Sequence, residues 1–288
     1  MKPPFAYFGG KTKLAGQIAG MLPEHEHYVE PFGGSLAVLL AKRPSRMETV
    51  NDIDGDLMLF WRVLRDRPGD LERVCALTPH ARAEFLEAYA LGEAPDDVER
   101  ARRVWVRLSQ SRTGTLLRTG WRHYVDPAGS SIGMPGYLGG YVERIGPAAA
   151  RLAGVSLECQ PALELIERYG QSPRVLLYVD PPYLGTTRVS GAYRHEMAAA
   201  AEHRALAEAL QACRAAVVLS GYDSPLYAEL YPGWHVHRIE TTTGQGGTRQ
   251  ERTEVLWSNR LAEPTLFGGV GLEAHAATSD RGAGYDVA

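Results

Sequence analysis

The sequence predicts an α/β fold whose sheet is interrupted by a largely helical and loop-rich insertion. Within the first 60 residues, a strand, a glycine loop, a helix and a second strand that ends in acids follow one another. Residues 174–179 consist of Arg174 followed by five apolar residues, a run that is typical of a strand buried in a parallel sheet. Between these parts, residues 61–148 show helical periodicity followed by glycine-rich sequence. This order is that of a Rossmann-like nucleotide-binding domain with an insertion.

The elements of the first part follow from local patterns. Residues 12–21 are predicted as a helix that begins after a glycine turn. Residues 28–30 are predicted as a strand that runs into the loop Pro31-Phe32-Gly33-Gly34, and residues 35–41 as the next helix. Residues 48–51 are a second strand, and acids follow it about 20 residues after the glycine loop. That spacing suits a carboxylate that accepts hydrogen bonds from ribose hydroxyls.

The insertion is predicted to be helical first and loop-rich afterwards. Leu57, Phe60, Trp61 and Leu64 recur at i, i+3, i+4 and i+7, the spacing of one helix face. Between residues 109 and 146 this periodicity is lost, and glycines are interspersed with aromatic residues. A long loop that carries aromatics and arginines is more typical of a functional surface than of a linker.

Seven arginines lie between residues 100 and 124, a stretch without Asp or Glu, although the net charge of the chain is −3. Two interpretations remain open. A local basic surface would neutralise nucleic-acid phosphates and release counterions. The near-helical spacing of the first four also fits a solvated helix face. The arginines are at positions 100, 102, 103, 107, 112, 118 and 122.

The second part returns to alternating helices and strands. Residues 198–213 are predicted as a helix and residues 216–219 as the next strand. Residues 235–241 and 254–257, joined by a glycine-rich loop, are predicted to form a terminal hairpin. Over residues 263–288, Gly and Ala are frequent and the hydrophobic pattern is weak, so we expect a disordered tail.

Composition limits the class of protein. Hydrophobic residues make up 44% and charged residues 23% of the 288 residues, which allows a full globular core. The three cysteines are far apart and odd in number, so a disulfide framework is not expected. The sequence has no apolar run of the roughly 20 residues that a membrane span needs and no signal-peptide pattern. We therefore expect a cytoplasmic protein without a membrane partner.

The most specific pattern is Asp180-Pro181-Pro182-Tyr183, directly after the predicted buried strand. Open α/β sheets bind ligands at such strand ends. The two prolines have no N–H, so carbonyls and the carboxylate can converge as acceptors on an exocyclic amino group, which has two donors. Tyr183 offers a flat face on which a base can stack. A plain turn at the strand end is the alternative, because Pro and Asp are turn formers.

Two glycine segments add weaker signals. Phe8-Gly9-Gly10-Lys11 opens the first predicted helix, where glycines allow a close approach to a ligand and a helix N-terminus favours an anionic group. A plain loop at the start of a helix is the alternative. Glu30-Pro31-Phe32-Gly33-Gly34-Ser35 is a moderate signal for a nucleotide loop. The sequence lacks a Gly-x-x-x-x-Gly-Lys-Ser/Thr loop, which disfavours a nucleoside-triphosphate hydrolase.

In this order, the segments resemble the Dam-like (D12 class) DNA adenine N6-methyltransferases over nearly the whole chain up to about residue 259. The resemblance implies a Rossmann-like S-adenosylmethionine-dependent methyltransferase sheet. It implies a catalytic domain of residues 1–60 and 149–262 and a target-recognition insertion of residues 61–148. The matching segments are residues 7–11, 29–34, 51–54 and 180–183, with Leu219-Ser220-Gly221-Tyr222-Asp223 and Arg252-Thr253-Glu254-Val255-Leu256-Trp257 in support. The family's glycine loop often has a further glycine where this chain has Ser35-Leu36.

The resemblance also implies roles for the matching residues. The catalytic residues that would hold the target adenine are Asp180, Pro181, Pro182 and Tyr183. Asp52 would bind the ribose of S-adenosylmethionine, and S-adenosylhomocysteine would be the product. The residues expected around the cofactor are Tyr7, Phe8, Gly9, Gly10, Lys11, Glu30, Pro31, Phe32, Gly33, Asp52, Ile53 and Asp180.

The expected reaction is a direct methyl transfer to N6 of an adenine flipped out of double-stranded DNA, without a metal. Within the insertion, Arg112, Arg118 and Arg122 are candidates for contacts with guanine edges or phosphates, and Tyr124 for stacking where the base leaves the duplex. A cytosine N4-methyltransferase and a non-catalytic DNA-binding protein that retains the fold remain alternatives. A cognate restriction endonuclease is a candidate partner in the cell, and we expect a monomer or weak dimer.

Overall fold

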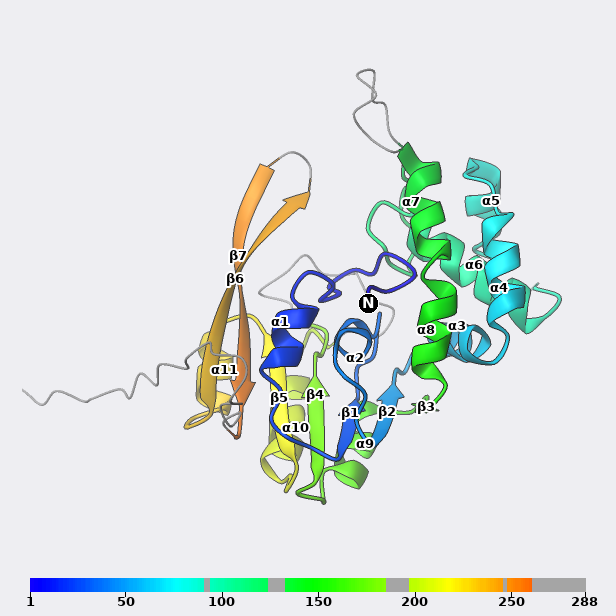
Figure 1. Cartoon of the computed structure of the whole chain (residues 1–288). Helices are drawn as coiled ribbons and strands as arrows, with labels where there is room; N and C mark the ends of the chain where they lie inside the picture. Colours follow the sequence, from blue (N-terminus) through cyan, green and yellow to red (C-terminus); the bar gives the residue numbers. More distant parts are fainter. Residues whose placement is uncertain (91–93, 124–132, 185–196, 246–247, 261–288) are drawn as a thin grey trace, which may run out of the picture.

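A computed structural model describes residues 1–90, 94–123, 133–184, 197–245 and 248–260. The predicted disordered tail therefore lies outside the described residues. The chain folds around one seven-stranded mixed sheet with the strand order β3-β2-β1-β4-β5-β7-β6 (Figure 1). Its strands are β1 His27–Glu30, β2 Met47–Asn51, β3 Val155–Glu158, β4 Val175–Val179, β5 Ala216–Gly221, β6 His235–Gln245 and β7 Thr248–Ser258.

The sheet confirms the predicted α/β fold. Strands β1 to β5 run parallel to one another, and β7 pairs antiparallel with both β5 and β6. The strand order reverses between β1 and β4, because β2 lies on one side of β1 and β5 on the other side of β4. Such a reversal leaves a crevice at the carboxyl ends of the strands, where open α/β sheets bind ligands.

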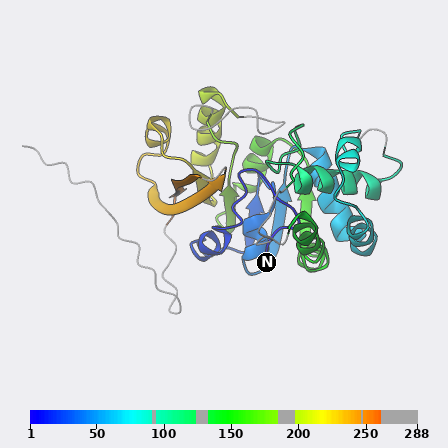
Figure 2. The same ribbon diagram turned by 90° about the horizontal axis from the view of Figure 1, so that it is seen from above.

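Helices cover both faces of the sheet (Figure 2). Alternate residues of each strand point to opposite faces, so Leu176 and Tyr178 of β4 belong to one apolar cluster and Leu177 and Val179 to the other. The first cluster also contains residues of α1 and α2, and the second those of α9, α10 and α11. These helices are α1 Ala15–Gly20, α2 Ala37–Ala41, α9 Ala162–Tyr169, α10 Ala200–Gln211 and α11 Pro225–Leu230.

Six further helices form a lobe beside the β3 edge of the sheet, called the helical lobe below (Figure 1). Helix α6 lies at its centre and packs against α3, α4 and α5. Fully buried Trp105 of α6 donates from Nε1 to Pro4 O at 2.9 Å, which joins the lobe to the N-terminal segment. The helices are α3 Gly55–Asp66, α4 Pro68–Ala76, α5 Arg82–Glu87, α6 Asp97–Gln110, α7 Gly133–Val142 and α8 Ile145–Leu152.

The predicted absence of regular structure between residues 109 and 146 is wrong for residues 133–142, which form α7, and for the start of α8. In α7, Met134 and Leu138 lie one turn apart and are buried, and the helix packs against α4. A Cβ atom added at Gly139 or Gly140 would meet nothing within 4 Å, so these glycines face open space. Burial of one apolar face therefore outweighs the low helix propensity of glycine. The predicted domain boundaries remain predictions.

Candidate active site

A cavity of about 650 Å³ opens at the carboxyl ends of β1 and β4, where the strand order reverses. All twelve residues expected around the cofactor line this one cavity, although they come from segments up to 170 residues apart. The twelve residues, which were chosen from sequence patterns, thus lie around one cavity. The remaining lining residues are Gly34, Ser35, Ala37, Val38, Asp54, Pro161, Ala162, Leu163, Tyr178, Pro182, Met197, Glu202 and Ala205.

The glycine loop after β1 lies tightly between two neighbours. A Cβ atom at Gly33 would stand 2.9 Å from Asn51 O, and one at Gly34 would stand 2.8 Å from Tyr7 Cε1. Gly34 also has a φ of 49°, in the left-handed region that glycine tolerates best. The loop therefore requires glycine both for its backbone torsions and for contact with the segment that carries Tyr7.

Asp52 follows β2 and faces the same loop. Its Oδ2 accepts a hydrogen bond from Gly34 N, and its Oδ1 accepts one from Asp54 N, both at 2.9 Å. These two bonds fix the orientation of the carboxylate at the cavity wall. Ile53 lies beside it at the rim of the cavity, 46% exposed.

Asn51 joins the glycine loop to a cavity wall that the sequence analysis missed. Its Nδ2 donates to Pro31 O at 2.9 Å and to Gln160 O at 3.0 Å, and its Oδ1 accepts from Gln160 N at 2.9 Å. This fully buried side chain thus holds the segment that leads into α9 against the loop after β1. Residues 161–163 reach the cavity in this way, and they carry no local motif that indicates a site.

Asp180 belongs to a cluster of hydrogen-bonded polar side chains, called the Lys11 cluster below. Its members are Lys11, Asp180, Tyr183, Ser220 and Glu254. Lys11 Nζ donates to Asp180 Oδ1 at 2.8 Å and to the Tyr183 hydroxyl. The Tyr183 hydroxyl donates to Glu254 Oε1 at 2.7 Å, as does Ser220 Oγ at 2.7 Å. The cluster joins the N-terminal segment to the ends of β4 and β5 and to the middle of β7.

The electrostatics of this site favour protonated carboxyl groups more than in water. Burial raises the pKa of Asp180 to about 6; the positive charge of Lys11 opposes this rise and the negative charge of Glu254 adds to it. Burial also raises the pKa of Glu30 to about 8, and a hydrogen bond from Tyr28 opposes that rise. Titratable groups with shifted pKa values in a cavity are typical of functional sites.

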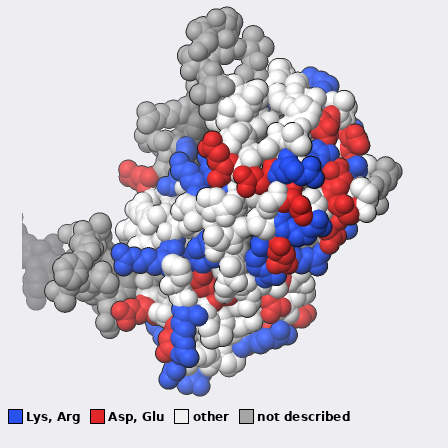
Figure 3. All heavy atoms as spheres, turned by 45° about the vertical axis from the view of Figure 1, so that its right-hand side comes forward, with Lys and Arg blue, Asp and Glu red and all other residues white. Residues whose placement is uncertain are grey.

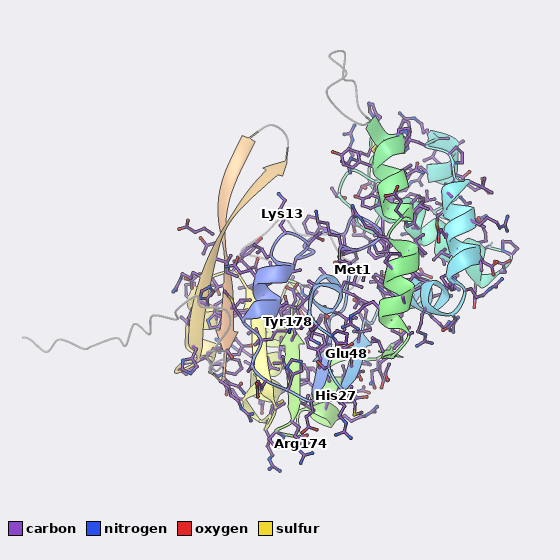
Figure 4. The ribbon with its side chains drawn as sticks, viewed as in Figure 1. Met1, Lys13, His27, Glu48, Arg174 and Tyr178 are labelled. Carbon is purple, nitrogen blue, oxygen red and sulfur yellow. The ribbon has the colours of Figure 1, made fainter. Side chains whose placement is uncertain are left out.

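The four predicted catalytic residues do not all face the cavity. Asp180 and Pro182 line it, whereas Pro181 is buried and Tyr183 lies behind Asp180 within the Lys11 cluster. The Tyr183 ring meets that of Tyr222 in an edge-to-face contact, with ring centres 4.5 Å apart. Figure 4 shows Tyr178, a further lining residue, on the central strand β4.

The first four arginines of the predicted basic stretch lie on α6, and all of them except Arg100 have largely buried side chains. Arg102 pairs with Glu84 and Glu99 at 2.6 Å, and Arg103 pairs with Glu99 at 2.7 Å. Arg107 is 3% exposed, and Arg100 pairs with Asp56 at 2.6 Å. Both open interpretations, a basic surface and a solvated helix face, are therefore wrong for Arg102, Arg103 and Arg107. Basic and acidic side chains alternate over this side of the molecule (Figure 3).

The later arginines lie on a hairpin-like loop after α6, called the arginine loop below (residues 111–123). Ser111 and Trp121 form an antiparallel bridge at its base. Gly114 O accepts a hydrogen bond from Phe8 N at 2.8 Å, so the loop packs on the segment that lines the cavity. Arg112 and Arg118 are exposed.

Arg122, the third predicted DNA-contacting arginine, is half-buried. Its guanidinium lies 5.1 Å from the centre of the Tyr137 ring of α7. Tyr124 lies outside the described residues.

Among the described residues, no cluster of three or more His, Cys, Asp or Glu side chains could hold a metal ion. Within the same part of the chain, no helix is long and apolar enough to cross a membrane.

Comparisons with known proteins extend the sequence pattern. A family described as D12 class N6 adenine-specific DNA methyltransferase matches residues 7–110 and 143–245. The type II methyltransferase M1.LlaDCHI of Lactococcus lactis subsp. cremoris is 27% identical over 90% of this chain and 95% of its own length. The DNA adenine methylase of Escherichia coli K12 is 26% identical over 86% of this chain and 91% of its own length.

A third relative, the type II methyltransferase M.MjaIII of Methanocaldococcus jannaschii, is 35% identical over 95 residues, which are 30% of this chain and 32% of that protein. The family match includes the segments that carry the cavity and the Lys11 cluster up to residue 245. It leaves out residues 111–142, which contain the arginine loop and α7. The family match therefore does not extend over that part of the chain.

Proposed function

Because the chain belongs to the D12 class N6 adenine-specific DNA methyltransferase family, we propose that its cavity binds S-adenosylmethionine and presents the methyl group to an adenine held at Asp180. The reaction is methylation of adenine N6 in DNA, so the cytosine N4 and non-catalytic alternatives are set aside. The observation that carries the proposal is the position of Asp180, which lines the cavity and also contacts Lys11.

The cavity suits this cofactor in size and in chemistry. Its volume of about 650 Å³ falls within the roughly 300–1,000 Å³ of small-molecule sites. Asp52 presents a carboxylate for the ribose hydroxyls, and the backbone of Gly33 and Gly34 allows close approach. Phe32 and Ile53 supply apolar surface for the adenine ring of the cofactor.

The cofactor, when bound, supplies an electrophilic methyl group. Asp180 accepts one N–H of the target amino group and the Pro181 carbonyl accepts the other, which orients N6 and increases its electron density. The N6 lone pair forms the new bond to carbon, and the electron pair of the breaking C–S bond stays on sulfur to give S-adenosylhomocysteine. The surplus N6 proton then passes to Asp180 or to water. Positioning is the larger catalytic contribution, since no strong base is required.

The test is to incubate the purified protein with S-adenosylmethionine labelled on the methyl group and with mixed-sequence duplex DNA, followed by nucleoside analysis. N6-methyladenine as the labelled product supports the proposal. Label on cytosine would contradict it, as would unlabelled DNA from a protein that calorimetry shows to bind the cofactor.

Methylation is expected to fall on the acidic side of pH 6. The pKa of Asp180 is raised to about 6 by burial, and a protonated carboxyl group is a weaker acceptor for the target amine. The value of kcat/KM, which reports the free enzyme, should fall by about tenfold per pH unit below that point. Initial rates between pH 5 and 9 at constant ionic strength measure it. A rate that stays level down to pH 5 would show that no group needed for methylation is protonated in this range, which contradicts the prediction.

The arginine loop is proposed to bind the DNA backbone or base edges beside the cavity. Arg112→Ala and Arg118→Ala should each weaken DNA binding and lower the slope of log Kd against log salt by about 0.9 if the residue contacts one phosphate. Fluorescence anisotropy between 50 and 200 mM salt measures both effects. Arg204→Ala, on α10 and paired with Glu229, is the matched control. Slopes equal to that of the control would argue against phosphate contacts.

The type II methyltransferases among the relatives support one further proposal. A restriction endonuclease with the same recognition sequence is the expected cellular partner, acting on DNA that this enzyme has not methylated. The expected location of both proteins is the cytoplasm, where the DNA is. Digestion of DNA from cells with and without the methyltransferase, using endonucleases of different specificity, would identify the shared sequence.

A further inference from the structure

Glu254, on the last strand, has a buried carboxylate that has no role in the methyl transfer proposed so far. It lies on β7. The next residue of that strand, Val255, pairs with Gly221 of β5. The Glu254 side chain is 6% exposed, and its Oε1 stands 3.6 Å from Lys11 Nζ. A carboxylate is rarely buried without a compensating role, because its desolvation is costly. Its surroundings therefore indicate what the charge is for.

The first effect of Glu254 concerns the Tyr183 hydroxyl. A hydroxyl has one proton to donate. Glu254 Oε1 is 2.7 Å from the Tyr183 oxygen, whereas Asp180 Oδ1 is 3.3 Å away. The Tyr183 proton therefore goes to Glu254. Asp180 Oδ1 receives its short hydrogen bond from Lys11 at 2.8 Å and keeps acceptor capacity for a ligand.

The second effect concerns charge. Lys11 and Asp180 alone would be a neutral pair, and the positive Lys11 would reduce the attraction of Asp180 for a cation. With Glu254, one lysine is shared between two carboxylates, so the Lys11 cluster has a formal charge of −1. During methyl transfer, positive charge moves from sulfur to N6. A net negative group beside N6 stabilises that change most in a site from which water is excluded.

We propose that Glu254 is a positioning residue for methyl transfer: it takes the hydrogen bond of the Tyr183 hydroxyl in preference to Asp180 and makes the Lys11 cluster net negative toward the target amine. This inference rests on the proposed function. The rise that Glu254 causes in the pKa of Asp180 is consistent with it. Among the described residues, the other titratable side chains around the two carboxylates are Lys11, Glu30, Tyr178, Tyr183, Tyr222 and Tyr227.

Glu254→Gln tests the proposal, because the amide retains an acceptor oxygen for Tyr183 and Ser220 and removes the charge. At saturating cofactor and DNA, kcat should fall by about 10- to 100-fold, by analogy with residues that support the ligands of a metal site. The dissociation constant of S-adenosylmethionine should change less than twofold. The acidic limb of kcat/KM should move to lower pH, because Asp180 loses a negative neighbour. Glu229→Gln, an exposed glutamate of α11, is the matched control.

Ser220→Ala is the second variant, for use also if Glu254→Gln does not fold. It removes one donor to Glu254 and leaves the carboxylate in place. The charge of Glu254 is then less stabilised, so the acidic limb should move to higher pH, opposite to the shift in Glu254→Gln. A purely structural role would lower thermal stability in either variant without moving the limb.

The outcomes separate this inference from the function on which it rests. A wild-type protein that binds S-adenosylmethionine and methylates no adenine overturns both. With an active wild type, a Glu254→Gln variant within twofold of wild-type kcat overturns the inference alone. The inference is also overturned if Glu254→Gln is slower but the acidic limb of its kcat/KM profile stays in place. The same holds if the acidic limb of Ser220→Ala does not move. Opposite shifts of the limb in the two variants support it.

Discussion

Asp180→Asn is expected to lower kcat for DNA methylation by about 10³-fold while the protein stays folded. Asparagine has nearly the same shape, but it replaces a charged acceptor with an amide whose NH₂ group would face either Lys11 or the target amine. Loss of one preorganised electrostatic contact in an active site lowers rates by about 10²–10³-fold, and here proton acceptance is lost as well. Single-turnover transfer of labelled methyl groups at saturating DNA measures the effect.

The control for Asp180→Asn is Asp70→Asn, which changes an exposed aspartate of α4 that pairs with Arg67. This control should leave kcat unchanged. The affinity of Asp180→Asn for S-adenosylmethionine should stay within a few-fold of wild type, because Asp52 and the glycine loop provide most of the proposed contacts. A variant that retains more than a tenth of wild-type kcat would show that Asp180 is not the acceptor of the amine.

Glu48→Ala is expected to lower the free energy of unfolding by about 3–5 kcal/mol, the usual effect of removing one partner of a buried ion pair. Glu48 of β2 accepts hydrogen bonds from Lys42 Nζ at 2.6 Å and from Arg151 Nη2 of α8 at 2.8 Å. The side chains of Lys42, Glu48 and Arg151 are 5%, 4% and 9% exposed. Without Glu48, two buried cations remain and repel each other. Figure 4 shows Glu48 on its strand.

Urea unfolding followed by circular dichroism measures this loss as a shift of the midpoint. Glu229→Ala, which removes a fully exposed ion pair with Arg204, should leave the midpoint nearly unchanged. A Glu48→Ala midpoint equal to that of the control would show that Lys42 and Arg151 reach water in the folded protein.

The ion pairs of Glu48 with Lys42 and Arg151 also predict how the free energy of unfolding depends on pH. Burial alone would raise the pKa of Glu48, but hydrogen bonds from Arg151, Lys42 and Ser45 outweigh it, so its pKa lies below the ordinary 4.5. The folded state therefore binds this proton less readily than the unfolded state. The contribution of Glu48 is fully present above pH 4.5 and is lost as the pH falls through the lower folded pKa. Glu48→Ala should be less sensitive to acid in this range than wild type.

The parts of the site that were predictable from the sequence are those with a local pattern. Asp180 follows five consecutive apolar residues, and such a run indicates a buried strand that ends at a ligand site. Asp52 and the glycine loop have a spacing that reflects one strand–helix–strand unit. Each of these patterns lies within about 25 consecutive residues, so it can be recognised without knowledge of the tertiary fold.

The parts that were missed depend on contacts between distant segments. Leu163 reaches the cavity because Asn51, more than 100 residues earlier, binds the segment before α9. Glu254 reaches Tyr183 because β7 enters the sheet beside β5. No periodicity or motif around either residue indicates such pairing.

The basic stretch was misread for a different reason. Glu99, which pairs with Arg102 and Arg103, lies one residue before the window of arginines. Helical spacing of three and four residues brings it to them within α6. Glu84 approaches Arg102 from the neighbouring helix α5. Counting charges along a window therefore overstated the positive surface, because pairing follows the helix and its neighbours.

Strand β7 lies between β5 and β6 in the sheet although it follows both in the chain. During translation, β1 to β5 leave the ribosome first and can pair, whereas β6 has no neighbouring strand until β7 emerges and inserts. Domains of this size fold as units once their elements are available. A nascent chain thus exposes Lys11 and Asp180 long before Glu254 joins them. The Lys11 cluster is therefore complete only after β7 has been synthesised and has paired with β5.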